Sequence, residues 1–215
     1  MVIPTAKANF LIQIATFFSS ILIIRFLGST GRGELALILL YPQLVSNIIN
    51  FGFDRSVAVI GGTKELHYPV LTISFITFLI SGPACVGAYF FIVFNVTDLD
   101  IRSLSLTYLI YIPAVYFFTI SVSYLNGVGD FNKYNRSRVS YYIVNLVLIC
   151  GSGLLFYGTE VMIKAIVYSS IATQYLVLGI AAWSIRRIAS VNMPFEWTLF
   201  KKDFISILKI TPKYL

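Results

Sequence analysis

The chain has 215 residues, of which 58% are hydrophobic and 12% are charged, and its 16 Lys and Arg residues against 9 Asp and Glu residues give a formal net charge of +7. Soluble domains usually carry about 25% charged residues, so this composition excludes an ordinary water-soluble domain and indicates a lipid bilayer as the solvent. The cations lie in short segments between apolar runs, so membrane topology explains them better than nucleic-acid binding does. We therefore expect membrane lipids, and no nucleic acid, as partners.

A transmembrane helix needs roughly 20 mainly apolar residues. Six stretches of the chain meet this condition, and in chain order they cover residues 8–27, 34–53, 70–94, 104–125, 139–157 and 161–185. The sequence thus predicts an all-α, polytopic membrane protein in which residues 1–187 form a six-helix transmembrane bundle. Residues 188–215 are predicted to form an amphipathic cytoplasmic linker followed by the start of a truncated seventh span.

The connections between the predicted spans divide the cations unequally. With the N-terminus in the cytoplasm, twelve Lys and Arg residues fall on the inner side and four on the outer side, the four being Arg25, Arg32, Arg102 and Lys164. Cytoplasmic connections of membrane proteins carry the excess of Lys and Arg. We therefore expect a multi-pass protein of the plasma membrane with a cytoplasmic N-terminus.

Between the first two predicted spans lies the segment GSTGRGE, residues 28–34. Its glycines permit tight backbone geometry where the first helix ends. A nucleotide-binding loop would read GxGxxG after a strand or end in GK[ST], and this segment does neither. It is predicted to be the outer turn of a helical hairpin.

Polar residues recur at helical spacing in the first two spans, in each case on one face of the helix. The first span carries Asn9, Gln13, Thr16 and Ser20, and the second carries Gln43, Asn47, Asn50 and Asp54. We predict that these side chains line a hydrated cavity. Amides and hydroxyls would suit a sugar-bearing substrate, because they donate and accept hydrogen bonds as sugar hydroxyls do. The competing interpretation is that they only tie helices together.

The last two spans carry weaker polar sets. They comprise Tyr141, Asn145 and Ser152 in the fifth span, and Lys164, Tyr168, Ser170, Gln174 and Tyr175 in the sixth. Hydrogen bonding between helices is the favoured interpretation here, with Asn145 and Gln174 as further candidates for the cavity. Arg25 and Lys164 are the two cations inside the predicted spans, and both lie near outer ends. They either extend to the membrane interface or contact an anionic pyrophosphate.

Little in the sequence favours catalysis or metal binding. The single histidine, His67, lies in a predicted cytoplasmic loop beside Pro69 and has no acid–base partner at a supporting spacing. Cys85 and Cys150 both fall inside apolar runs, without metal-ligand spacing. We expect no enzyme, no catalytic residue, no metal site and no cofactor; a membrane enzyme such as a glycan polymerase or acyltransferase is the rival class.

Three segments of the chain together match the pattern of a known group of membrane exporters. They are residues 25–56, RFLGSTGRGELALILLYPQLVSNIINFGFDRS, residues 125–148, LNGVGDFNKYNRSRVSYYIVNLVL, and residues 200–215, FKKDFISILKITPKYL. The first looks like the first hairpin of polysaccharide-exporting flippases of the multidrug/oligosaccharidyl-lipid/polysaccharide exporter superfamily. The second resembles the inner loop that leads into their fifth span, and the third is similar to their linker into the seventh span.

The resemblance implies a fold of two six-helix lobes around a central cavity, of which this chain would be the N-terminal lobe. It also implies a flippase of the cell inner membrane that moves a lipid-linked oligosaccharide, an O-antigen (lipopolysaccharide) or capsular repeat unit, to the outer leaflet. The implied partners are undecaprenyl-pyrophosphate-linked oligosaccharide, the missing C-terminal lobe and a glycan polymerase complex. Rocking of the lobes would be driven by a coupling cation or by the membrane potential.

Two departures bear on the alternatives within the superfamily. Lipid II flippases resemble the chain around the same hairpin but place arginine where Ser46 and Asn47 stand here. Drug exporters often carry a cation-binding acid in their first span, and residues 8–27 contain none. A cation-coupled multidrug or small-molecule antiporter is the alternative function, and a complete six-span protein that dimerises is a further one.

Overall fold

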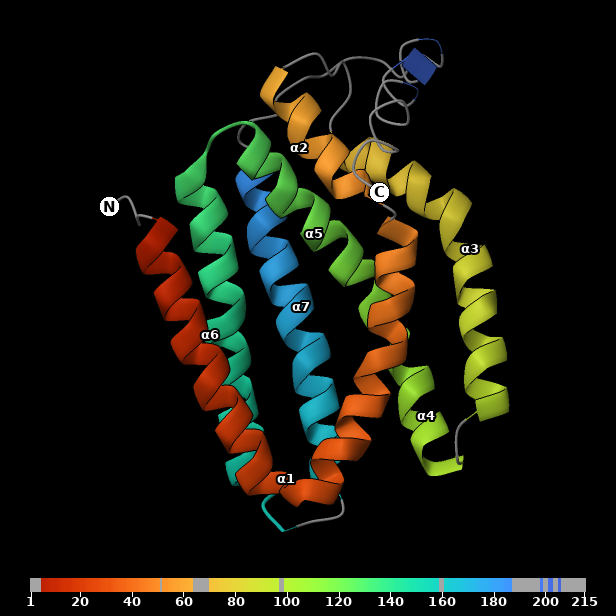
Figure 1. The fold of residues 1–215 in the computed structure, drawn as a ribbon, viewed down its shortest axis with the longest axis vertical. Helices are drawn as coiled ribbons and strands as arrows, with labels where there is room; N and C mark the ends of the chain where they lie inside the picture. The colour runs from red at the N-terminus through yellow and green to blue at the C-terminus, as the bar shows by residue number, and fades with distance from the viewer. Residues whose placement is uncertain are drawn as a thin grey trace.

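In a computed structural model, the described residues are 5–50, 52–63, 70–96, 99–158 and 161–186, together with residues 198, 201, 202 and 205. Within them the protein is all-α and contains no strand. The helices are α1 (Thr5–Asn50), α2 (Phe53–Thr63), α3 (Val70–Val96), α4 (Leu99–Tyr108), α5 (Tyr111–Gly127), α6 (Phe131–Leu155) and α7 (Met162–Arg186) (Figure 1). His67 and nearly all of the predicted linker 188–215 lie outside the described residues.

Four helical segments in the described part of the chain are long and apolar enough to cross a membrane. They are α1, α6, α7 and the stretch Arg102–Gly127, which includes most of α4 and all of α5. This is consistent with a multi-pass membrane protein, and it is fewer than the six predicted spans. Part of the difference has a plain cause, because α1 alone covers the first two predicted spans. The helix α3 coincides with the third predicted span but is not among the four.

The helix α1 is folded back on itself at a single residue. Its 46 residues would extend for about 69 Å at 1.5 Å per residue, more than twice the hydrocarbon thickness of a bilayer. At Gly28 the backbone has φ 69° and ψ −174°, a conformation that glycine adopts without steric cost. The prediction of a turn over residues 28–34 is therefore corrected, since residues 29–34 are helical. We call residues 5–27 the first arm of α1 and residues 29–50 its second arm.

The fourth predicted span is interrupted between α4 and α5, at Leu109 and Ile110. Pro113 has no amide hydrogen, so the Leu109 carbonyl accepts from Ile112 N instead, at 3.1 Å. The hydroxyl of Tyr175 in α7 donates to the carbonyl oxygen of Ile110 at 2.8 Å. The proline near the start of α5 accounts for the break, and the tyrosine on α7 donates a hydrogen bond to the carbonyl oxygen beside it.

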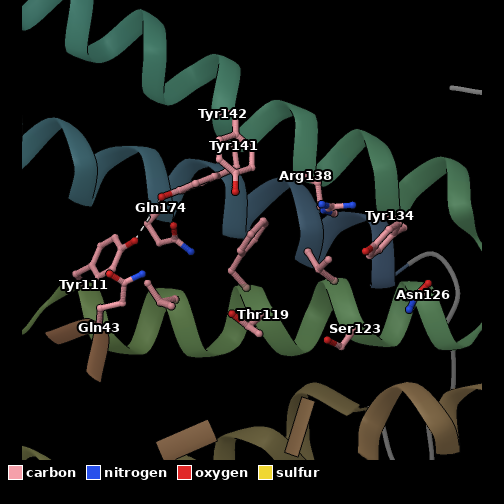
Figure 2. Close-up of a pocket in the computed structure, with 13 residues that line it drawn as sticks. Gln43, Tyr111, Thr119, Ser123, Asn126, Tyr134, Arg138, Tyr141, Tyr142 and Gln174 are labelled. Carbon is pink, nitrogen blue, oxygen red and sulfur yellow. Dashed lines mark hydrogen bonds between the residues drawn. The ribbon is translucent and has the colours of Figure 1, made fainter. Parts of the chain in front are cut away.

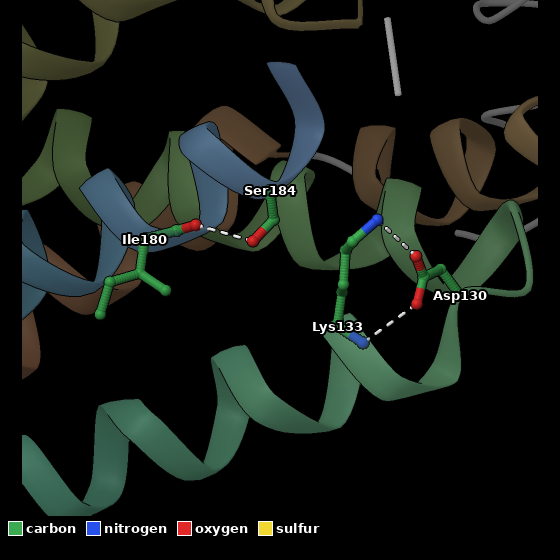
Figure 3. A network of polar contacts seen from close by, with 4 residues as sticks. All are labelled: Asp130, Lys133, Ile180 and Ser184. Atoms are coloured by element: carbon green, nitrogen blue, oxygen red, sulfur yellow. Dashed lines mark hydrogen bonds and ion pairs between the residues drawn. The ribbon is translucent and has the colours of Figure 1, made fainter. Parts of the chain in front are cut away.

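The helix α6 begins eight residues earlier than the fifth predicted span, so most of the predicted basic loop 126–138 is helical. Asp130 is its N-terminal capping residue, and its Oδ1 accepts from Lys133 N at 3.1 Å. The ammonium group of Lys133 also lies 2.8 Å from Asp130 Oδ2 (Figure 3). Both interactions hold the negative form of the carboxyl group and lower the pKa of Asp130 below its usual value. A capped helix start therefore replaces the expected loop.

Two large buried clusters and a small third one, in which Ala8 and Ile12 of α1 pack against Val139 of α6, hold the helices together. One joins α1, α2, α3 and α5, and its largest fully buried side chains are Tyr89 and Tyr116. The other joins both arms of α1 to α4, α6 and α7, and includes Leu35, Ile149 and Ile166. In a bilayer the lipid tails are as apolar as these side chains, so close van der Waals packing, rather than escape from water, is what holds the clusters together.

Figure 1 shows that the bundle has two distinct ends. One end carries the start of α1, the α5–α6 connection and the end of α7, and we call it the N-terminal end. The opposite end carries Gly28, the α6–α7 connection and the start of α4, and we call it the kink end. Arg25, Arg32 and Lys164 lie near the kink end, and all three side chains are exposed.

Candidate functional site

A cavity of about 400 Å³ lies among the second arm of α1, α5, α6 and α7. Its size falls in the range of about 300–1,000 Å³ that is usual for sites of small molecules and cofactors. Ten of its lining residues carry polar groups or a charge, and all ten are labelled in Figure 2. They are Gln43, Tyr111, Thr119, Ser123, Asn126, Tyr134, Arg138, Tyr141, Tyr142 and Gln174.

The polar groups on α5 lie on one face because of their spacing. Thr119, Ser123 and Asn126 follow one another at i, i+4 and i+7. Tyr111 lines the same cavity from the start of the helix, so the lined length from Tyr111 to Asn126 is about 22 Å at 1.5 Å per residue. The cavity is therefore a long one that runs from the α4–α5 break toward the N-terminal end.

The helix α6 contributes the opposite wall. Tyr134, Arg138 and Tyr141 are spaced i, i+4 and i+7, and Asn145 continues the same face one turn further. Because α6 starts at Phe131 rather than near residue 139, Tyr134 and Arg138 belong to this helical face instead of to a loop. The early helix start is what brings these two side chains to the cavity.

Arg138 is the charged side chain that lines this cavity in the described part of the chain. Its Nη1 donates to Asn9 Oδ1 on the first arm of α1 at 3.2 Å. Its Cζ lies 5.1 Å from the centre of the Tyr134 ring, a distance suited to a cation–π interaction. The guanidinium group is thus held at the rim between two helices, with donors left over for a ligand.

A second, smaller cavity of about 190 Å³ adjoins the first. It shares Gln43, Tyr111 and Tyr141 with the larger cavity. Its other polar lining residues are Tyr108, Asn145 and Ser170, and the rest are aliphatic: Ile23, Leu35, Leu39, Ile149 and Ile166. These aliphatic side chains belong to, or pack against, the buried cluster at the kink end, so this end of the smaller cavity is closed by packed core.

The candidate residues from the sequence divide into two sets. Gln43, Asn145 and Gln174 line the cavities, and the Gln174 side chain is only 2% exposed. The others line neither cavity: Gln13, Thr16, Ser20, Asn47, Asn50 and Asp54. The Thr16 hydroxyl donates to the Ile12 carbonyl at 2.8 Å, and Asn50 Oδ1 accepts from Asp54 N at 3.3 Å. A role in binding substrate stays a prediction for all of them.

Arg25 and Lys164 are exposed at the kink end and line neither cavity. A pyrophosphate held by either would lie far from the larger cavity, which extends toward the opposite end. Ser152 and Tyr175, from the weaker polar sets, make contacts between elements, with the Ser169 hydroxyl and the Ile110 carbonyl. For these two residues, interhelical hydrogen bonding describes what the side chains do.

Several residues that line the larger cavity were not among the candidates from the sequence. Thr119, Ser123 and Asn126 had a usable signal in their helical spacing, but it ran to the very end of the predicted span. Tyr134 and Arg138 were hidden because they fell in a segment read as a loop. Tyr111 and Tyr142 carry no signal of their own, since tyrosine is frequent in this chain, with 14 copies.

In the described residues, no group of three His, Cys, Asp or Glu side chains is arranged to hold a metal ion. The chemistry of the cavities is instead hydrogen bonding by neutral hydroxyls and amides, beside aromatic faces and one guanidinium group. Comparison of the chain with protein-family models, with curated proteins and with solved structures gives no match.

Proposed function

We propose that the chain is one lobe of a membrane flippase that carries a lipid-linked oligosaccharide across the plasma membrane. In this proposal the chain crosses the membrane six times, with both arms of α1 as separate crossings. The sequence resemblance supplies the two-lobe architecture and an undecaprenyl-pyrophosphate-linked repeat unit of O-antigen or capsule as the cargo.

The observation that carries the proposal is the lining of the larger cavity. Nine of its polar side chains are uncharged hydroxyls or amides, which pair with sugar hydroxyls as both donors and acceptors. Tyrosines add rings with apolar faces, which suit the C–H faces of sugars, together with a polar tip. Such a lining favours a neutral, many-hydroxyl ligand over a simple ion.

The distribution of charge supports the direction of transport. The larger cavity reaches toward the N-terminal end, where Lys7, Lys133 and Arg136 also lie. With this end in the cytoplasm, as the excess of cations predicts, the cavity would face the compartment in which the oligosaccharide is assembled. Arg138 at its rim would then be the first cation that an incoming anionic lipid headgroup meets.

The test uses the intact gene in its own host. Disrupting it should abolish surface glycan and leave sensitivity to cationic drugs unchanged, and the restored gene should recover the glycan. Gln174→Leu should reduce glycan export at unchanged membrane abundance, because a buried amide of the cavity is lost. Tyr168→Phe is the matched control, since Tyr168 is exposed and lines neither cavity. Drug sensitivity without a glycan defect would instead establish the antiporter.

A further inference from the structure

We infer that Tyr111 and Tyr141 form a gate between the two cavities, and that the smaller cavity is a separate subsite for one amphipathic group of about the size of a sugar ring. The inference deepens the proposed function, since it assigns both cavities to the same ligand. Its test, however, measures access to the smaller cavity and requires no transport.

The positions of the two tyrosines make them a partition. Tyr111, Tyr141 and Gln43 are the residues that line both cavities, so they form the wall between them. The two hydroxyl oxygens lie 3.4 Å apart across the space between α5 and α6 (Figure 2). This is longer than the usual 2.7–2.8 Å for a bond between hydroxyl groups, so the contact is a weak one that opens at low cost.

Each tyrosine is supported by neighbouring rings, which define its closed position. The Tyr111 ring is stacked on Tyr108, with centroids 4.4 Å apart. The Tyr141 ring lies 5.8 Å from Phe118 and 5.1 Å from Tyr142. Aromatic pairs at these distances contribute about 0.5–1.5 kcal/mol each beyond the area that they bury. The rings therefore rest in a preferred position, while the hydroxyl contact that joins them is weak.

Tyr111 lies beside a break in the regular helix. It is the first residue of α5, directly after the break at Leu109 and Ile110. Ile110 is the N-cap residue of α5, and its carbonyl oxygen also accepts from the Tyr175 hydroxyl of α7 at 2.8 Å. A small change of angle between α4 and α5 would therefore carry Tyr111 away from Tyr141 without breaking a regular helix.

The smaller cavity fits a compact ligand group that is polar on one side. Its volume of about 190 Å³ corresponds to roughly six water molecules at their liquid volume. Asn145, Ser170 and Tyr108 provide hydrogen-bonding groups, and Ile149 and Ile166 provide an apolar floor. The buried cluster packs against the kink end of this cavity, and the tyrosine pair separates it from the larger cavity.

Thiol labelling of the purified full chain in detergent tests the gate. In a background with Cys85→Ser and Cys150→Ser, a small charged methanethiosulfonate is applied to Ser123→Cys, in the larger cavity, and to Asn145→Cys, in the smaller one. With the tyrosines intact, Asn145→Cys should react about tenfold more slowly than Ser123→Cys, because its access depends on opening of the pair. Adding Tyr141→Ala should bring the rate at Asn145→Cys to within about threefold of Ser123→Cys.

Two further variants keep the result interpretable. Tyr141→Phe retains the ring and removes only the hydroxyl contact, so it should give an intermediate rate in a normally folded protein. Tyr168→Ala, at an exposed tyrosine that lines neither cavity, should leave both rates unchanged. The gate is overturned if Asn145→Cys reacts as fast as Ser123→Cys with both tyrosines present, or if neither change at Tyr141 raises its rate. If disruption of the gene abolishes surface glycan but neither change at Tyr141 alters the labelling rates, the flippase is retained and the gate is rejected.

Discussion

The close packing of α2 against α5 predicts that a side chain larger than hydrogen at position 127 lowers the stability of the protein. At Gly127, the last residue of α5, a Cβ atom would lie 1.9 Å from the carbonyl oxygen of Ala58 and 2.8 Å from its Cα. Cβ atoms essentially never approach other heavy atoms closer than 3.0 Å. The change Gly127→Ala must therefore push the backbones of α2 and α5 apart.

The expected cost follows from the nature of the obstacle. Overpacking of this kind costs about 1–3 kcal/mol, and a backbone obstacle places it at the upper end because no side chain can rotate away. Replacing glycine by alanine in a helix returns about 0.5–1 kcal/mol. The net loss is about 2 kcal/mol, equivalent to a decrease of about 4–8 °C in Tm for a chain of this size.

Thermal unfolding of the purified protein in detergent, followed by tryptophan fluorescence, measures this loss. Gly151→Ala is the matched control, because Gly151 lies inside α6 and a Cβ there meets nothing within 4 Å. It should leave Tm unchanged or raise it by about 2–4 °C, since only the helix-propensity term applies. A Tm for Gly127→Ala equal to or above that of the unaltered protein would refute the close approach of α2 to α5.

Three further predictions concern the candidate site and its supports. The double variant Gln43→Leu with Asn47→Leu should insert normally into the membrane and lower surface glycan. Of the two single variants, only Gln43→Leu should lower it, because Asn47 lines neither cavity. Equal glycan export by all three variants would count against a role for the cavity. Asp130→Ala should lower stability by about 1 kcal/mol through loss of the helix cap, whereas Asp130→Asn should keep the cap and lose only the pairing with Lys133. The pKa of Asp130 is lower in the folded protein than in the unfolded chain, where it is about 3.9. Its stabilising contribution should therefore be fully present above the unfolded pKa and disappear as the pH falls through the folded pKa. The Tm of Asp130→Asn should accordingly equal that of the unaltered protein only in acid. Gly28→Ala should cost about 1–3 kcal/mol, measured as Tm, since φ 69° with ψ −174° is a backbone conformation that essentially only glycine adopts.

The sequence was informative where the physics is local. Apolar length indicated an all-helical membrane protein, and polar residues inside apolar runs included Gln43, Asn145 and Gln174, which line the cavities. It was less informative where tertiary contacts decide. Gly28 was expected to open a loop of seven residues, but one residue with positive φ makes the turn.

The remaining differences have similar causes. Charge in the segment 126–138 suggested solvated loop, yet the Asp130 cap starts a helix there and brings Arg138 to the cavity. The pairing of Tyr111 with Tyr141, 30 residues apart, depends on how α5 and α6 pack. No pattern in the sequence of either helix predicts that these two side chains meet.

The single-residue turn in α1 also sets how the bundle can deform. Phe26, two residues before it, lies so close to Gly153 that a Cβ on Gly153 would be 2.1 Å from its ring, which pins the pivot to α6. Each arm is about 33 Å long, so a change of about 10° in the angle at Gly28 would displace its far end by about 6 Å. The first arm is bonded to α6 near that end, through Thr5 and Asn9, so α6 would have to move with it while the kink end stays nearly in place.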